Sequence, residues 1–320
     1  MSRRNVDVPA LVDGARGGAP RAVARLISLV EDAHPALREI MAALAPHTGR
    51  AHILGITGSP GVGKSTSTNA LVTSFRARGK RVGVLAVDPS SPFSGGALLG
   101  DRVRMQDHAL DPEVYIRSMA SRGHLGGLSW SAPQALRVLD AAGCEVILVE
   151  TVGVGQSEVE IVGLADTTIV LLAPGMGDGI QAAKAGILEI GDIFVVNKAD
   201  RDGADSTVRD IRHMVSLGDR SDAGTWRAPV LKTVAAKNEG VAEVMGAIDD
   251  HLGWMTEHGV LHQRRRRRAA DEIESIAMAS IRERIGDLRS GRGLEDLAHR
   301  VVQGELDPYT AADSLVSQIA

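Results

Sequence analysis

The stretch Gly58-Ser59-Pro60-Gly61-Val62-Gly63-Lys64-Ser65 has the spacing G-x-x-x-x-G-K-S of a phosphate-binding P-loop. An apolar, β-prone run (53–57) precedes it and a helical pattern (65–78) follows, as this loop requires. Its glycines let backbone N–H groups surround a phosphate, and the helix N-terminus adds partial positive charge. We expect Lys64 to reach the β- and γ-phosphates and Ser65 to bind Mg²⁺. The expected nucleotide-binding residues here are Gly58, Ser59, Pro60, Gly61, Val62, Gly63, Lys64, Ser65 and Thr66.

The whole chain has an ordinary soluble composition, with 320 residues of which 44% are hydrophobic and 24% charged. Its net charge of -4 gives no indication of nucleic-acid binding. No apolar run approaches the roughly 18 residues of a membrane span, and no apolar signal segment follows Arg4. Cys144 is the single cysteine, which excludes an intrachain disulfide and predicts a cytoplasmic protein.

From residue 51 onward, predicted strands and helices alternate along the chain. The predicted strands are 53–57, 81–87, 145–149, 167–172, 193–196 and 230–233, and the predicted helices are 65–78, 130–142, 180–190, 207–217 and 241–252. This alternation predicts an α/β fold, a P-loop NTPase domain with a mostly parallel sheet and helices on both faces. Ligands of such sheets bind at the carboxyl ends of the strands, where the P-loop also lies.

The P-loop domain (51–255) is flanked by segments with helical patterns. Residues 1–50 have the apolar spacing of helices that pack on a main domain. Residues 256–320 contain no predicted strand and form a C-terminal helical arm, opened by five arginines (264–268) that we interpret as a solvated helix start. The apolar positions that follow need a partner surface, either the P-loop domain or a second copy of the chain.

Asn197-Lys198-Ala199-Asp200 follows a predicted strand (193–196) and distinguishes between nucleotide bases. The Asp200 carboxylate can accept hydrogen bonds from N1–H and the 2-amino group of guanine. Adenine offers neither donor, so it would leave the carboxylate buried and unpaired. The motif therefore predicts a guanine nucleotide as ligand, contacted by Asn197, Lys198 and Asp200.

Glu150-Thr151-Val152-Gly153 directly follows another predicted strand (145–149). In GTPases this strand end carries an acid for the Mg²⁺ shell and a glycine whose N–H meets the γ-phosphate. Ras-like enzymes place a water-orienting glutamine immediately afterwards, where this chain has Val154, and Gln156 stands two residues further on. We therefore expect Glu150 and Gly153 to take part in catalysis, and unassisted hydrolysis to be slow.

Two more acids flank a loop rich in proline, serine and glycine, Asp88 before it and Asp101 after it. Such a loop suits a nucleotide-dependent switch, with both acids near the metal. The alternatives are a turn-capping role for Asp88 and a helix N-cap for Asp101. The candidate metal ligands are Ser65, Asp88, Asp101 and Glu150, and the candidate catalytic residues are Lys64, Asp88, Asp101, Glu150 and Gly153.

Five motifs occur together in one order: Gly58–Ser65, Asp88–Met105, Arg122–Leu128, Glu150–Ser157 and Asn197–Asp200. Over roughly residues 10–310 the chain resembles the MeaB/ArgK family of methylmalonyl-CoA mutase-associated GTPases. The resemblance implies a homodimer that uses Mg²⁺ with GTP or GDP. It also implies a chaperone that gates cofactor loading of the adenosylcobalamin-dependent methylmalonyl-CoA mutase, or a related mutase, and protects and reactivates it.

The resemblance further implies a relay of nucleotide state to the mutase at residues 177–184, through Asp178, Gln181 and Lys184. The chain departs from the family pattern at Val234-Ala235-Ala236, where the family usually carries Ser-Ala against guanine. Any contact of these three residues with the base therefore has to come from the backbone.

Two other functions stay open at this point. A kinase or ATPase linked to basic amino acid transport would use the P-loop, but would have no use for a guanine-reading Asp200. A nickel-insertion GTPase would share the fold, but needs a cluster of Cys or His. The ten histidines are scattered, and His258 and His262 are the pair at helical spacing.

Overall fold

The computed structural model describes residues 6–89, 107–108, 110–121, 131–151, 163–175, 190–218, 224–290 and 292–317. The chain divides into two compact units, Met1–His262 and Gln263–Ala320. The larger unit takes in both the N-terminal helical segment and the P-loop domain that the sequence predicts.

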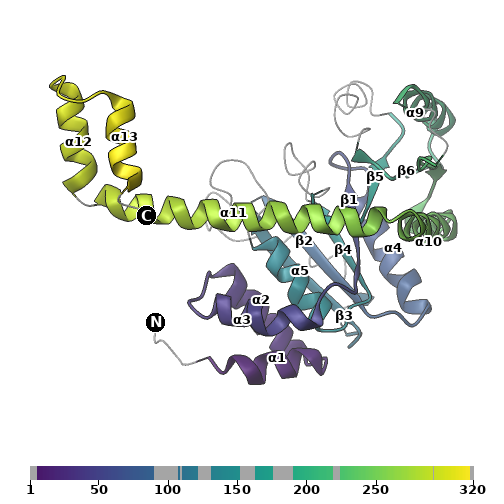
Figure 1. Cartoon of the computed structure of the whole chain (residues 1–320). Coiled ribbons are helices and arrows are strands. Elements are labelled where there is room, and N and C mark those ends of the chain that lie inside the picture. The colour runs from purple at the N-terminus through teal and green to yellow at the C-terminus, as the bar shows by residue number, and fades with distance from the viewer. Residues whose placement is uncertain are drawn as a thin grey trace. The chain divides into compact units, whose positions relative to one another are not determined.

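The larger unit is built on a seven-stranded sheet in the order β3-β2-β4-β1-β5-β6-β7, in which every neighbouring pair is parallel (Figure 1). The strands are β1 (His52–Thr57), β2 (Val82–Pro89), β3 (Val114–Ser121), β4 (Val146–Thr151), β5 (Thr167–Leu172), β6 (Ile193–Val196) and β7 (Val230–Lys232). Because β1 pairs with β4 and β5, the P-loop that follows β1 leaves the sheet at the middle of its carboxyl edge.

Alternate residues of a strand point to opposite sides of the sheet. Both sides carry buried apolar residues here, and helices cover both faces. On one face α4 (Lys64–Ala77) and α10 (Val241–Glu257) share a core with Leu54, Ile56 and Leu148. The other face is covered by two groups: α1, α2, α3 and α5 over Val149 and its neighbours, and α9 over Phe194. These helices are α1 (Val8–Arg16), α2 (Pro20–Glu31), α3 (Leu37–Leu44), α5 (Ala132–Ala141) and α9 (Ala204–Gly218), with short 3-10 turns at Ala45–His47 and Ala235–Lys237.

The N-terminal helices pack directly on the sheet. Leu26 and Val30 of α2 are fully buried in one core with Leu139 of α5. The hydroxyl of Tyr115 on β3 donates to the carbonyl oxygen of Gly18 at 2.9 Å, which ties the same helices to the sheet edge.

β3 is an edge strand that the sequence analysis does not predict. Of its apolar side chains, Tyr115 and Met119 are buried, whereas Val114 and Ile116 are only partly covered. Arg117 lies between Ile116 and Met119 in the strand, and it pairs with Glu31 of α2. The strand therefore lacks the unbroken apolar run that marks the central strands of a parallel sheet.

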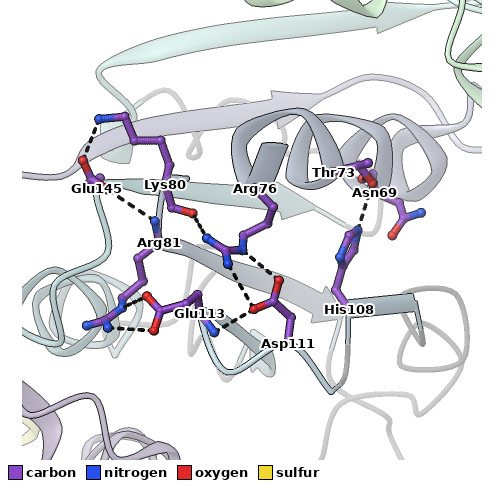
Figure 2. Close-up of polar contacts among 9 residues, drawn as sticks. All are labelled: Asn69, Thr73, Arg76, Lys80, Arg81, His108, Asp111, Glu113 and Glu145. Atoms are coloured by element: carbon purple, nitrogen blue, oxygen red, sulfur yellow. Dashed lines mark hydrogen bonds and ion pairs between the residues drawn. The ribbon is translucent and has the colours of Figure 1, made fainter. Parts of the chain in front are cut away.

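Ion pairs hold the amino-terminal ends of β2, β3 and β4 against α4 (Figure 2). Arg81 donates to both carboxylate oxygens of Glu113, at 2.7 and 3.0 Å, and Arg76 donates to both of Asp111, at 2.8 and 3.3 Å. With the Lys80–Glu145 pair of 2.6 Å these residues form what we call the entry brace: Arg76, Lys80, Arg81, Asp111, Glu113 and Glu145. Hydrogen bonds from these cations lower the pKa of all three carboxyl groups of the brace.

The smaller unit consists, in its described residues, of most of α11 (Val260–Ser290) with α12 (Arg292–Val302) and α13 (Pro308–Ser317). Pro308 opens α13, where its missing N–H costs no hydrogen bond. Within the described residues, no helix has the length and hydropathy to cross a membrane.

Candidate nucleotide-binding site

The P-loop connects β1 to α4, and two of its glycines are required by close approaches. Gly58 has φ 141°, and an added Cβ would overlap the carbonyl oxygen of Leu171 on β5. Gly63 has φ 96° at the N-cap of α4, and an added Cβ would lie 2.5 Å from Asn197 Nδ2. Within the described residues no side chain caps the first turn of α4, and that turn carries no acid. Its N–H groups therefore suit an anionic ligand.

Lys64 is the first residue of α4, and its ammonium group lies across the P-loop. Nζ donates to the carbonyl oxygens of Gly58 at 2.5 Å and Ser59 at 3.3 Å. Both acceptors are neutral, so phosphate oxygens would offer the ammonium a stronger, charge-assisted partner. The position of Lys64 is compatible with its predicted role at the β- and γ-phosphates.

Glu150 stands near the carboxyl end of β4 with only 1% of its surface exposed. Ser65 Oγ donates to its Oε1 at 3.0 Å, and the Thr68 hydroxyl donates to its Oε2. Hydroxyl and carboxylate oxygens are the hard donors that Mg²⁺ binds in nucleotide sites. The pair Ser65 and Glu150 therefore fits the predicted Mg²⁺ site.

Other predicted site residues cannot be placed in the same way. Asp88 belongs to β2, which neighbours β4, but its side chain lies outside the described part of the structure. Beyond the described residues lie Asp101, Gly153, Asp178, Gln181 and Lys184. Their predicted roles stay predictions.

Asn197 connects three loops at the carboxyl edge of the sheet. Its Nδ2 donates to the carbonyl oxygen of Val62 in the P-loop at 2.8 Å. Its Oδ1 accepts from the Thr233 hydroxyl and from the Ala235 N–H, both at 3.1 Å. Asn197 is 3% exposed, so these bonds are made away from water, and the side chain holds the phosphate-binding and base-reading loops together. We call this arrangement the Asn197 clamp.

The remaining residues of the predicted base-reading motif lie around the clamp. Lys198 has φ 57° and reaches back to the P-loop, where Nζ donates to the carbonyl oxygen of Gly61 at 2.5 Å. Asp200 is about half exposed and pairs with Lys237 at 3.5 Å. Its carboxylate is thus accessible to a ligand, as reading a base would require.

The predicted third loop, Val234-Ala235-Ala236, turns into the 3-10 helix Ala235–Lys237. Val234 and Ala235 are buried, and Ala236 is exposed. The Ala235 N–H is engaged by Asn197, so a backbone contact from that N–H would compete with the clamp.

Sequence reasoning missed three side chains of this region: Thr68, Thr233 and Lys237. Thr68 follows Ser65 at helical spacing, i and i+3, which places both hydroxyls on one face of α4 and could have indicated it. Thr233 and Lys237 carry no such signal, because they meet Asn197 and Asp200 only through the order of β6 and β7 in the sheet.

No converging set of three or more His, Cys, Asp or Glu side chains occurs in the described part of the chain. His258, half of the histidine pair noted in the sequence, instead bonds through Nδ1 to the carbonyl oxygen of Trp254 at 2.9 Å and stacks on its ring. The described residues therefore provide no Cys or His cluster of the kind that the nickel-insertion alternative needs.

A P-loop on the central strand, a buried acid beside its serine and an Asn-Lys-Ala-Asp loop held against it define a P-loop GTPase. The chain belongs to the family described as methylmalonyl Co-A mutase-associated GTPase MeaB, whose model matches residues 23–289. The predicted family, the predicted α/β P-loop fold and the predicted GTPase activity are thereby confirmed.

Individual relatives agree with this assignment. A putative GTPase of Pyrococcus abyssi is 48% identical over 311 residues, which cover 97% of this chain and 96% of that protein. The mitochondrial methylmalonic aciduria type A homolog of Caenorhabditis elegans is 32% identical over 332 residues, covering 97% of this chain and 82% of that protein. A crystal structure described as LAO/AO transport system kinase aligns with a TM-score of 0.72 and 28% identity, covering 100% of this chain and 99% of that one.

Proposed function

We propose that this GTPase is a chaperone of an adenosylcobalamin-dependent mutase, methylmalonyl-CoA mutase or a related isomerase. In this role it gates cofactor loading and protects and reactivates the mutase. The observation that carries the proposal is the family match over residues 23–289, a range that includes all five nucleotide and switch motifs. The name of the Caenorhabditis elegans relative supports the same link to methylmalonyl metabolism.

Different residues of the chain would bind the phosphates, the metal and the base of the nucleotide. The first turn of α4 and Lys64 bind the phosphates, Ser65 and Glu150 hold Mg²⁺, and Asp200 reads guanine. Mg²⁺, when bound, neutralises negative charge on the β- and γ-phosphates. Asp88 and Asp101 are proposed to contribute further oxygens to the metal shell, and the Gly153 N–H to meet the γ-phosphate.

Slow unassisted turnover is part of the proposal, because Val154 cannot orient a water molecule. The partner mutase would then complete catalysis, with Asp178, Gln181 and Lys184 passing on the nucleotide state. GTP hydrolysis would then determine how long the GTP-bound state of the chaperone lasts on the mutase.

Homodimer formation is also proposed, through the C-terminal arm. Among the described side chains of helix α11, the large apolar ones that are exposed are Ile273, Ile276, Met278 and Ile281. Ile273, Ile276 and Ile281 share one side of the helix, and a second copy of the chain would remove this apolar surface from water.

The test is GTP turnover by the full chain with and without the purified mutase, loaded with adenosylcobalamin. We expect the mutase to stimulate wild-type turnover, and Lys184→Ala to lower the stimulation at least tenfold while GTP affinity stays within about threefold, under roughly 1 kcal/mol. Lys232→Ala, which removes an exposed lysine paired with Asp205, is the matched control and should behave as wild type. Absence of any stimulation would refute the mutase role. Equal stimulation of Lys184→Ala and wild type would show that this loop does not pass on the nucleotide state.

A kinase linked to basic amino acid transport is the alternative that the description of the aligned crystal structure raises. A guanine-reading Asp200 argues against it, because adenine lacks both the N1–H and the 2-amino group from which this carboxylate would accept hydrogen bonds. Affinities for ATP and GTP measured side by side distinguish the two functions, and a preference for ATP would favour the kinase.

A further inference from the structure

The acid beside the P-loop serine is a glutamate, and it is buried. Glu150 has one methylene group and one rotatable bond more than an aspartate, so its carboxylate can adopt more positions. At 1% exposure a carboxylate without enough donors is also costly. A site built on Glu150 therefore needs a second group that fixes the carboxylate in one orientation.

Thr68 is in the right place to be that group. It is fully buried on α4, and its Oγ1 lies within hydrogen-bond distance of Glu150 Oε2 and, at 3.0 Å, of the Lys64 carbonyl oxygen. A hydroxyl has a single proton, and a carboxylate is a stronger acceptor than a neutral carbonyl group. The proton is therefore donated to Glu150.

The two carboxylate oxygens consequently have different partners. Oε2 is held by Thr68, whereas Oε1 is held 3.0 Å from Ser65 Oγ. If the Ser65 oxygen gives a lone pair to a metal, its proton can still be donated to Oε1. The bond from Thr68 is independent of such a metal and fixes Glu150 before one binds.

We propose that Thr68 is a positioning residue for the metal site, acting through Glu150. Its hydroxyl orients the carboxylate so that Oε1 faces the place where Ser65 and Mg²⁺ meet. The inference rests on the proposed role of Ser65 and Glu150 in binding Mg²⁺ together with a guanine nucleotide.

The experiment measures how strongly Mg²⁺ slows the release of a fluorescent GDP analogue from the full chain. Release is followed in excess Mg²⁺ and in EDTA, and the ratio of the two rates reports the metal's contribution. We expect Thr68→Val, which keeps the shape but lacks the proton, to reduce this ratio roughly tenfold, as expected for one hydrogen bond to a charged group. The rate in EDTA should change by less than about twofold.

Two variants separate positioning from a general loss of structure. Thr68→Ser keeps the hydroxyl and should restore the wild-type ratio. Ser67→Ala is the matched control, because the Ser67 hydroxyl, next to Thr68 and also buried, has no hydrogen-bond partner among the described residues. It should leave both release rates unchanged.

Each outcome decides between the inference and the function on which it rests. A wild-type protein that binds the nucleotide without any effect of Mg²⁺ would overturn the proposed metal site, and the inference with it. A wild-type ratio preserved in Thr68→Val would overturn only the role of Thr68, as would an equal loss in Ser67→Ala. Should the Val variant fail to fold by circular dichroism, Thr68→Ala carries the same expectation, and failure of both to fold would make Thr68 a structural residue only.

Discussion

Replacing Asn197 with alanine should destabilise the protein even in the absence of nucleotide. The substitution removes the Asn197 clamp, that is, the bonds to the Val62 carbonyl, the Thr233 hydroxyl and the Ala235 N–H. A hydrogen bond contributes about 0.5–1.5 kcal/mol net, and partners left buried without one cost more. We therefore expect a loss of about 2–4 kcal/mol in the free energy of unfolding. For a unit of this size that corresponds to a drop in Tm of roughly 5–15 °C.

The assay is thermal unfolding of the nucleotide-free protein, followed by tryptophan fluorescence. Trp226 and Trp254 both lie in the larger unit, close to each other, and report on its unfolding. Asn69→Ala is the matched control, because Asn69 Nδ2 makes one exposed hydrogen bond of 3.3 Å to Asp107. The control should shift Tm by no more than about 2 °C. An unchanged Tm for Asn197→Ala would show that the clamp does not stabilise the empty site, and would refute the reasoning.

Three further predictions concern charge, burial and the phosphate site. The lowered carboxyl pKa values of the entry brace mean that its stabilisation is present above roughly pH 4, where unfolded carboxyl groups are charged, and is lost as the pH falls through the lower folded values. Asp111→Asn should therefore lower Tm at pH 7 more than at pH 3, and equal shifts at both would contradict this. Burial raises the pKa of the Cys144 thiol to about 12, so a thiol reagent at pH 8 should label it only on unfolding, and rapid labelling of the native protein would count against the burial. Lys64→Ala should abolish tight GTP binding in calorimetry and leave the circular dichroism spectrum unchanged. A variant that binds GTP as tightly as wild type would show that Lys64 does not bind the phosphates.

The central strands could be predicted from the sequence because each is an unbroken apolar run bounded by turn residues. The predicted strands 167–172 and 193–196 coincide with β5 and β6, and 53–57 falls within β1. β3 escaped prediction because an edge strand buries little, and half of its side chains are only partly covered. The order of strands was also out of reach, since it depends on crossover connections and not on local pattern.

The candidate site could be predicted as far as its chemistry lies in contiguous motifs. The P-loop and Asn197–Asp200 each carry their spacing within a few residues, so their pattern is visible in the sequence. The contacts of Asn197 with Thr233 and of Asp200 with Lys237 join residues about 36 positions apart, through the pairing of β6 with β7. Such contacts become visible only in the folded chain.

The most direct test of the account is whether Asp200 reads the guanine base. Calorimetry would compare GDP, ADP and xanthosine diphosphate with wild-type protein, with Asp200→Asn, and with Asp205→Asn as an exposed control. We predict that wild type and the control prefer GDP, and that Asp200→Asn shifts the preference toward xanthosine diphosphate, because the amide donates where xanthine carries an oxygen. An Asp200→Asn variant that keeps the wild-type margin for GDP would contradict the assignment of the base-reading loop.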